Sequence, residues 1–408
     1  MRITAVILCI VLFFEALYCF FVFTDIPSIK TLRNQFISTA ISTMSHQWLA
    51  KAFLPEYMVD HVQQNLDNFY QSQEGINSDD SDRHQPTTDA NNSTVNPFED
   101  FNTETTPLDP DADPKEEAFF SLFYELNRSS FEAYADEHPE VLANGWENVY
   151  INEAGIDDEG TEIYTTMGEQ VLAIDAKNQI LLVRVTGTGY QGVLAIAKDP
   201  SQLRCEPSAG IGNYGQTLDQ LVSGNNGILG MNGSGFYDPD GRGNGGVVAG
   251  TAVCNGVRYD GAPYGATYKR LELSENNKFY IVDTFYSIGE DVTDAVEFSP
   301  ALIIDGEMIV SGFSEFDGIH PRAAIGQSSR GEILMLVIEG RQVTRSMGTN
   351  VETCANILMR HSCYTAMNLD GGTSAVMWYD GEYVTVCSNP DISSRSLPNA
   401  WVYGSSGE

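Results

Sequence analysis

The stretch AMNLDGGTSAVMWYDG, residues 366–381, interrupts an apolar run with one acidic residue, two glycines and two hydroxyls. A second acid–glycine pair, Asp380-Gly381, follows between AVMW and EYVTV, the setting of a tight β-hairpin turn. Asp305-Gly306 lies between ALII and EMIV and has the same form. We interpret both of these pairs as structural turns.

Asp370 has a different setting, because it ends a hydrophobic strand that follows a predicted helix. Gly371 and Gly372 carry no Cβ, so another group can approach the backbone closely. Thr373 and Ser374 add hydroxyls beside them. Since ligands collect at strand ends in such folds, we favour a site at Asp370 over a purely structural turn.

Outward from this stretch, residues 116–408 read as one dense β-rich domain. It opens with EEAFFSLFYELN (116–127), which predicts an amphipathic helix. Short apolar runs separated by Gly-, Asn- and Asp-rich turns then predict strands. These runs are QVLAIDA, QILLVRVTG, QGVLAIAKD, KFYIVDTF, ALIIDGEMIV, EILMLVIEG and TAMNLDG.

One helix is predicted late in this domain, over residues 350–361, between strands 332–338 and 364–369. Thr349 and Glu352 have the spacing of a capping box at its start. A strand–helix–strand order allows a crossover, and therefore parallel pairing within a mixed sheet. We expect an α+β or mixed α/β protein, with a mixed β-sheet catalytic domain and flanking helices.

The amino terminus predicts a membrane anchor over residues 1–23. Residues 3–23 are almost wholly apolar, with Glu15 as the interruption, and about 20 residues suffice to cross a bilayer. A cleaved signal peptide is the alternative, but no small-x-small cleavage site follows the run. Arg2 on one side and Lys30 on the other leave the orientation poorly determined. We expect a single-pass protein of the cell membrane with an extracellular catalytic domain.

Residues 24–72 predict a helical stem, because apolar residues recur at helical spacing on both sides of Pro55. The stem could dimerise the chain or lie on the catalytic domain, and the pattern does not decide between them. Residues 73–115 are rich in Ser, Thr, Asn, Asp and Pro, which predicts a flexible acidic linker.

The charge of the chain limits its partners. It has 56 acidic against 22 basic residues and a formal net charge of −34, so a nucleic-acid partner is not expected. An anionic substrate would need locally placed arginines. Six histidines without HxH or HExxH spacing, and no CxxC, give no indication of a metal or other cofactor.

Three further segments resemble strand exits with polar groups: MNGSGFYDPDGRGNGG (231–246), HPRAAIGQ (320–327) and VIEGRQ (337–342). They supply an amide, guanidinium groups, a carboxylate and flexible glycines. Such a set suits a substrate that carries both a phosphate and a sugar, since the planar fork of arginine matches phosphate oxygens. The candidate residues in these segments are Asn232, Gly235, Arg322, Glu339 and Arg341.

GIHPRAAIGQ, EILMLVIEGRQ and AMNLDGGTSAVMWYDGEYV, in this order, resemble the phosphodiester glycosidase domain family. NGSGF upstream and SLPNAWVYG downstream extend the resemblance over about residues 170–404. Thr373 stands where the family usually has glycine, Ala323 where it has threonine, and Glu339 where it has aspartate. The resemblance implies hydrolysis, at the anomeric carbon, of an N-acetylglucosamine-1-phosphodiester or an envelope phosphopolymer such as an exopolysaccharide.

On this hypothesis Asp370 is the nucleophile or base, and Glu339 is the alternative or partner carboxylate. Arg322 and Arg341 hold the phosphate, which leaves as an anion and so depends less on a general acid. The remaining contacts to the sugar are assigned to Asn232, Gly235, Gly371, Gly372 and Ser374.

Two other functions remain open from the sequence. One is a module that binds or assembles cell-envelope polysaccharide without hydrolysis. The other is a metal-dependent phosphodiesterase that cuts the P–O bond. The partner is therefore a sugar phosphate or glycopolymer, with the membrane engaged through the first helix.

Five cysteines lie outside the anchor, an odd number. Cys363 with Cys387, or Cys205 with Cys254, could pair in an oxidising compartment.

Overall fold

The computed structural model describes residues 2–43, 47–78, 113–263 and 268–404. Most of the predicted linker, residues 79–112, lies outside the described residues. The chain divides into two compact units. One comprises Met1–Ser72 with Ser311–Ile319, and the other comprises Gln73–Val310 with His320–Glu408.

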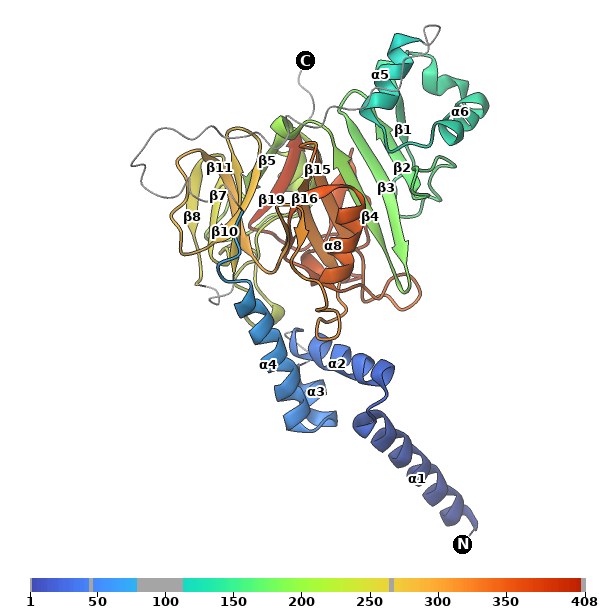
Figure 1. Cartoon of the computed structure of the whole chain (residues 1–408), viewed down its shortest axis with the longest axis vertical. Helices are drawn as coiled ribbons and strands as arrows, with labels where there is room; N and C mark the ends of the chain where they lie inside the picture. The colour runs from blue at the N-terminus through green and yellow to red at the C-terminus, as the bar shows by residue number, and fades with distance from the viewer. Residues whose placement is uncertain (1, 44–46, 79–112, 264–267, 405–408) are drawn as a thin grey trace. The chain divides into compact units, whose positions relative to one another are not determined.

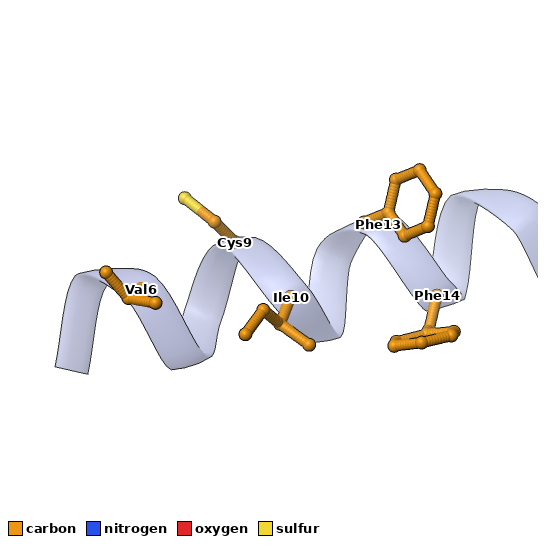
Figure 2. A pocket seen from close by; sticks show the side chains of 5 residues that line it. All are labelled: Val6, Cys9, Ile10, Phe13 and Phe14. Carbon is orange, nitrogen blue, oxygen red and sulfur yellow. The ribbon is translucent and has the colours of Figure 1, made fainter. Parts of the chain in front are cut away.

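The first unit begins with α1 (Arg2–Phe23), the predicted apolar helix (Figure 1). Its segment Val6–Phe23 is long and apolar enough to cross a membrane, judged by length and composition. Figure 2 shows five of its side chains projecting from the helix. They are the apolar or weakly polar residues Val6, Cys9, Ile10, Phe13 and Phe14.

The stem consists of three helices: α2 (Pro27–Ile41), α3 (Gln47–Phe53) and α4 (Glu56–Ser72). The segment 311–319 packs on them within the same unit. Asn34 Nδ2 donates to Glu315 Oε1 at 2.9 Å, and the rings of Phe69 and Phe313 stack with centroids 3.5 Å apart. The predicted helical stem is therefore present, but it holds a loop that belongs to the second half of the sequence.

The second unit starts earlier than the predicted domain boundary. Ser78 N donates to Ile281 O at 2.9 Å, and Gly75 N donates to Asp283 Oδ2 at 2.9 Å. Residues 73–78 thus lie on a strand and are not part of a free linker. Two helices follow the linker, α5 (Pro114–Leu122), which Asp113 caps, and α6 (Arg128–Glu137).

Among the described residues of the second unit, the largest sheet has nine strands. In spatial order they are β1 (Tyr150–Asn152), β2 (Gln170–Asp175), β3 (Ile180–Gly187), β4 (Tyr190–Ala197), β15 (Ile333–Ile338), β14 (Arg322–Ser328), β16 (Cys363–Leu369), β12 (Ala301–Ile304) and β13 (Glu307–Met308).

Two five-stranded sheets complete the domain. The first is ordered β10 (Phe279–Asp283), β9 (Lys269–Ser274), β11 (Val292–Phe298), β7 (Thr251–Cys254) and β8 (Val257–Asp260). The second is ordered β18 (Glu382–Tyr383), β17 (Met377–Tyr379), β6 (Gly227–Asn232), β19 (Asn399–Gly404) and β5 (Leu203–Pro207).

The mixed helix-and-sheet class is confirmed, but parallel pairing does not form in these ladders. The strands β15 and β16 flank α8 (Val351–Arg360) in the sequence, and both pair with β14 in antiparallel fashion. Because β14 lies between them, they run in the same direction without touching.

The cap of α8 is also different from the predicted one: Asn350, not Thr349, accepts the hydrogen bond from Thr353 N, at 2.9 Å.

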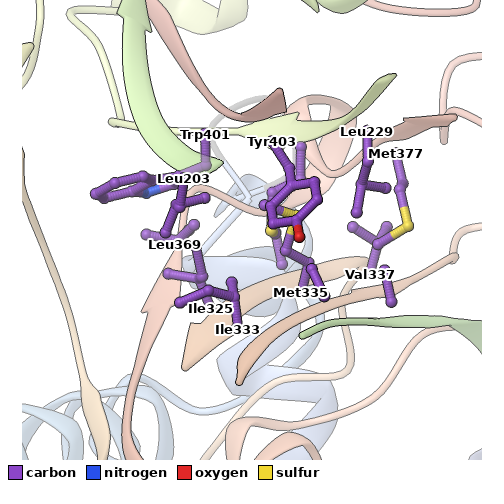
Figure 3. Packing of buried hydrophobic residues seen from close by; sticks show 14 of the residues in the cluster. Leu203, Leu229, Ile325, Ile333, Met335, Val337, Leu369, Met377, Trp401 and Tyr403 are labelled. Carbon is purple, nitrogen blue, oxygen red and sulfur yellow. The ribbon is translucent and has the colours of Figure 1, made fainter. Parts of the chain in front are cut away.

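The hydrophobic core lies between the nine-stranded sheet and the sheet of β6, β17 and β19. Alternate residues of each strand face inward, and Figure 3 shows them meeting across this space. The two sides include Ile325, Met335 and Val337 from one sheet, and Leu229, Met377, Trp401 and Tyr403 from the other. The outer faces are covered by α8 and by α7 (Leu218–Ser223).

Both predicted acid–glycine turns are present. Asp305 (φ 50°) and Gly306 (φ 81°) join β12 to β13, while Asp380 (φ 45°) and Gly381 (φ 99°) join β17 to β18. Positive φ at both central residues is the conformation of a type I′ hairpin. The structure therefore separates these turns from Asp370, as the sequence indicated.

The structure also distinguishes between the two predicted cysteine pairs. Cys205 and Cys254 are buried, with their Sγ atoms 3.4 Å apart, so this pair stays a predicted site of oxidation. Cys363 begins β16, whereas Cys387 contacts the Thr373 carbonyl beyond the other end of that strand. Seven strand residues span roughly 20 Å, so the pairing of Cys363 with Cys387 does not fit.

Candidate active site

The central strands of the nine-stranded sheet end together. Arg322, the first residue of β14, pairs with Ile338, the last of β15. Ala323 pairs with Leu369, the last residue of β16. An antiparallel register therefore brings Arg322, the exit of β15 and Asp370 to one edge of the sheet.

Asp370 is partly buried at this edge. Loss of solvation raises the pKa of its carboxyl to about 6. The Ser374 hydroxyl and the Arg395 guanidinium oppose this shift in pKa, whereas the charge of Asp238 adds to it. Asn232, the last residue of β6, donates from Nδ2 to the backbone carbonyl of Asp370 at 2.7 Å. The backbone at Asp370 is thus held where two sheets meet.

Arg341 lies in the loop after β15 and has φ 62°, a left-handed conformation that is uncommon outside glycine. Burial lowers the pKa of its guanidinium, and the negative charge of Asp370 opposes that change in pKa. A Cβ on Gly372 (φ +59°) would lie 3.1 Å from Arg341 Nη2. Gly372 therefore leaves room for the guanidinium beside the carboxylate.

Other glycines let the strand-exit loops converge on His320 and Pro321. A Cβ on Gly340 would lie 2.8 Å from Pro321 N, and one on Gly371 would lie 2.6 Å from Pro321 O. A Cβ on Gly348 (φ +104°) would lie 2.4 Å from the His320 carbonyl. Side chains at these positions would force the loops apart and separate the charged groups they carry.

Arg322 and Arg341 lie near one imidazole. Arg322 Nε donates to Thr349 O at 3.2 Å, and Thr349 exchanges backbone hydrogen bonds with His320 at 3.1 and 2.9 Å. Burial, and then the charges of Arg322 and Arg341, hold the pKa of His320 well below its usual range. Both predicted arginines thus lie near enough to His320 for their charges to act on its pKa.

Polar atoms near this edge that are buried without a hydrogen-bond partner among the described residues include Asn232 Oδ1, His320 Nε2 and Ser374 Oγ. Buried polar atoms are normally paired, and an unpaired one costs about 1–3 kcal/mol. A polar ligand at the strand ends would satisfy them.

Glu339 has a different environment from the one predicted. Its side chain is 2% exposed, and both carboxylate oxygens accept hydrogen bonds. Arg345 donates to them at 2.5 and 3.0 Å, Val386 N at 2.9 Å and Gln191 Nε2 at 3.3 Å. A carboxylate held in this way anchors the loops after β15 and β18, so the geometry favours Asp370 for chemistry.

We predict that Arg345→Met destabilises the fold by about 3–5 kcal/mol, because it leaves the buried Glu339 carboxylate uncompensated. Arg258→Met is the matched control, since the Arg258–Asp260 pair is exposed and such pairs contribute only about 0–1 kcal/mol. Thermal unfolding of the two variants measures the difference. Equal melting temperatures would contradict the structural role of Glu339.

Gly235 is not seen to take part in this site. A Cβ at this position would lie 2.8 Å from the Phe298 ring, so the residue allows close packing. The sequence analysis also missed Arg395, which donates to Asp238 Oδ2 at 2.8 Å and lies 4.4 Å from the centre of the Phe236 ring. Asp238 lies within the glycine-rich segment 231–246, whereas Arg395 immediately precedes SLPNAWVYG (396–404).

Comparison with known proteins relates one segment of the chain to a family. Residues 225–403 match the sequence profile of the phosphodiester glycosidase family. The predicted family resemblance is confirmed over this segment. All of the candidate residues lie within it, and the phosphodiester glycosidase assignment supports a glycosidase-type function for the domain.

Individual relatives are distant. The SPbeta prophage-derived uncharacterized protein YomE of Bacillus subtilis (strain 168) is 26% identical over 184 residues, 43% of this chain. The chain spans only 28% of the length of that relative.

Two solved structures show partial similarity. The catalytic domain of zebrafish N-acetylglucosamine-1-phosphodiester alpha-N-acetylglucosaminidase, auto-inhibited by its pro-peptide, has a TM-score of 0.43 and 16% identity, covering 55% of this chain and 82% of that one. A hypothetical protein from Synechocystis has a TM-score of 0.38 and 14% identity, covering 57% of this chain and 63% of that one.

Proposed function

We propose that this chain hydrolyses the anomeric C–O bond of a sugar-1-phosphodiester, releasing the sugar and a phosphomonoester. The observation that carries the proposal is the Arg341 guanidinium beside Gly372, near enough to Asp370 for the charge of that carboxylate to oppose the lowering of its pKa by burial. A carboxylate can act as nucleophile or base at the anomeric carbon, and a guanidinium can stabilise a phosphate that departs as an anion. Asn232 Oδ1, buried and unpaired among the described residues, is available to a sugar hydroxyl.

In the proposed reaction the Asp370 carboxylate acts at the anomeric carbon while Arg322 and Arg341 hold the phosphate. As a base, Asp370 removes a proton from water, whose oxygen bonds to the anomeric carbon as the C–O bond breaks. As a nucleophile, it forms a glycosyl ester that water then hydrolyses. In either case the electron pair of the broken bond leaves on the phosphate oxygen, beside the two guanidinium groups.

The test uses the full-length chain in detergent with a panel of sugar-1-phosphodiesters in ¹⁸O-labelled water. The proposal expects release of free sugar with the label on the sugar. Label on the phosphate would show P–O cleavage, and binding of a glycan without sugar release would show a binding module. The anomeric configuration of the first product, read by NMR, separates the nucleophile (retention) from the base (inversion).

We predict an acid limb in the pH profile of kcat/KM near pH 6. The reacting form is the ionised carboxylate of Asp370, whose pKa is raised to about 6, so activity is present above this pH and is lost as the pH falls through it. Arg395→Gln should move the limb to higher pH. It removes a positive charge that lowers the pKa of Asp370, and it leaves the charge of Asp238 unpaired.

The control for this prediction is Arg258→Gln, which removes an equal charge from an exposed pair. Its acid limb should stay where the wild-type limb is. A limb that moves equally in both variants, or moves to lower pH in Arg395→Gln, would contradict the role of Asp370 as the titrating group.

We further propose that α1 anchors the chain in the cell membrane with the domain outside, where an envelope glycopolymer would be accessible. The length and composition of Val6–Phe23 support the anchor. Protease added to intact cells is expected to degrade the domain. Degradation only after the membrane is opened would place the domain on the inner side.

A further inference from the structure

We propose that His320 is a further substrate contact, whose Nε2–H donates a hydrogen bond to the phosphate held by Arg322 and Arg341. This inference rests on the proposed function and assigns one more residue of the same site. His320 stands two residues before Arg322 in the segment HPRAAIGQ.

The first observation is an unsatisfied atom in a tightly held side chain. His320 is 8% exposed, and its Nε2 has no hydrogen-bond partner among the described residues. The backbone around it is fixed, because His320 and Thr349 exchange hydrogen bonds in both directions and Gly348 packs on the His320 carbonyl. A residue held this firmly with one nitrogen unpaired is poised for a ligand.

The second observation is the charge around the ring. The groups that act on His320 are the guanidiniums of Arg322 and Arg341, and with burial they keep the imidazole neutral. A neutral imidazole has one N–H and one lone pair. The ligand group that best suits two cations and an N–H donor is an anion with acceptor oxygens, which a phosphate provides.

A buried histidine of the core is the alternative, and it makes a different prediction. A core residue would be replaced by any side chain of similar size with a loss of stability alone. A phosphate contact requires a donor at the position of Nε2. Glutamine places its amide nitrogen near Nε2, whereas asparagine is too short to reach it, so His320→Gln and His320→Asn form a matched pair.

The experiment measures binding of inorganic phosphate to the full-length chain by calorimetry, and kcat/KM on a sugar-1-phosphodiester and on an aryl glycoside of the same sugar. We expect His320→Asn to weaken phosphate binding and to lower kcat/KM on the phosphodiester by about 10- to 100-fold, as for a hydrogen bond to a charged group. His320→Gln should restore much of both. The loss in His320→Asn should be clearly larger on the phosphodiester than on the aryl glycoside, which has no phosphate.

His361→Asn is the control for a buried histidine outside the site, since His361 is 6% exposed and its Nε2 lies 3.0 Å from Glu169 Oε2. It should lower the melting temperature and leave phosphate binding unchanged. Wild-type phosphate affinity in His320→Asn, or equal losses on both substrates without rescue by glutamine, would overturn the inference. If the wild-type chain binds phosphate through His320 but releases no sugar, the proposed function fails while this contact stands.

Discussion

Replacement of Asp370 by asparagine is expected to lower kcat by about 1,000-fold or more, because the amide can neither attack the anomeric carbon nor accept a proton. Asparagine keeps the size of the side chain, and its amide oxygen can still accept hydrogen bonds. It also removes a charge whose burial is unfavourable, as the raised pKa of Asp370 shows. The melting temperature should therefore stay the same or rise. Kinetics, substrate binding and thermal unfolding measure the three effects.

Asp260→Asn is the matched control, since Asp260 lies on the exposed strand β8 and pairs with Arg258. It should turn over substrate at the wild-type rate. Near-normal turnover in Asp370→Asn would remove the role from Asp370. The next residue to test would be Asp238, whose charge acts on Asp370, and not the fully hydrogen-bonded Glu339.

The location of the candidate site follows from local sequence. An apolar run that ends in an acid and two glycines marks a strand exit, and Asp370, Arg322 and Arg341 stand at such exits. The two hairpin turns were equally local, because type I′ turns place particular demands on their central residues. The neighbouring residues alone are enough to predict these features.

The partners of those residues were not predictable, because they depend on register. The crossover through α8 suggested neighbouring parallel strands, but β14 pairs with both β15 and β16 and lies between them. The same register decides which exits share an edge. A pattern of apolar residues predicts which face of a strand is buried, but it does not predict which strands pair with it.

The environments of Glu339 and His320 were not predictable, for a similar reason. Glu339 is neutralised by Arg345, which the chain reaches six positions later through the Gln342–Ser346 turn, and by a backbone N–H from residue 386. His320 is buried because loops that contain glycine close over it. The residues next to Glu339 and His320 in the sequence do not predict either environment.

Loss of either predicted phosphate-binding arginine is expected to lower kcat/KM on a sugar-1-phosphodiester by about 100-fold, or about 3 kcal/mol, by analogy with removal of one oxyanion donor. In Arg322→Ala and Arg341→Ala the departing phosphate loses a guanidinium as its charge grows. Lysine at either position should give an intermediate rate, since it keeps the charge and loses the planar fork. The measurement is steady-state kinetics on the full-length chain, with Arg258→Ala as the control for loss of an exposed guanidinium.

An aryl glycoside of the same sugar, with a good uncharged leaving group, tests whether the effect belongs to the phosphate. The two alanine variants should cleave it at nearly the wild-type rate, while Asp370→Asn stays inactive. Equal losses on both substrates would mean that the arginines shape the site and do not bind the leaving group.

For Arg341 a further variant distinguishes backbone strain from loss of the guanidinium. The φ of 62° favours glycine, so Arg341→Gly should be at least as stable as Arg341→Ala. It should also be equally slow on the phosphodiester. A faster rate in the glycine variant would trace the loss to the backbone, whereas equal rates leave the missing guanidinium as its cause.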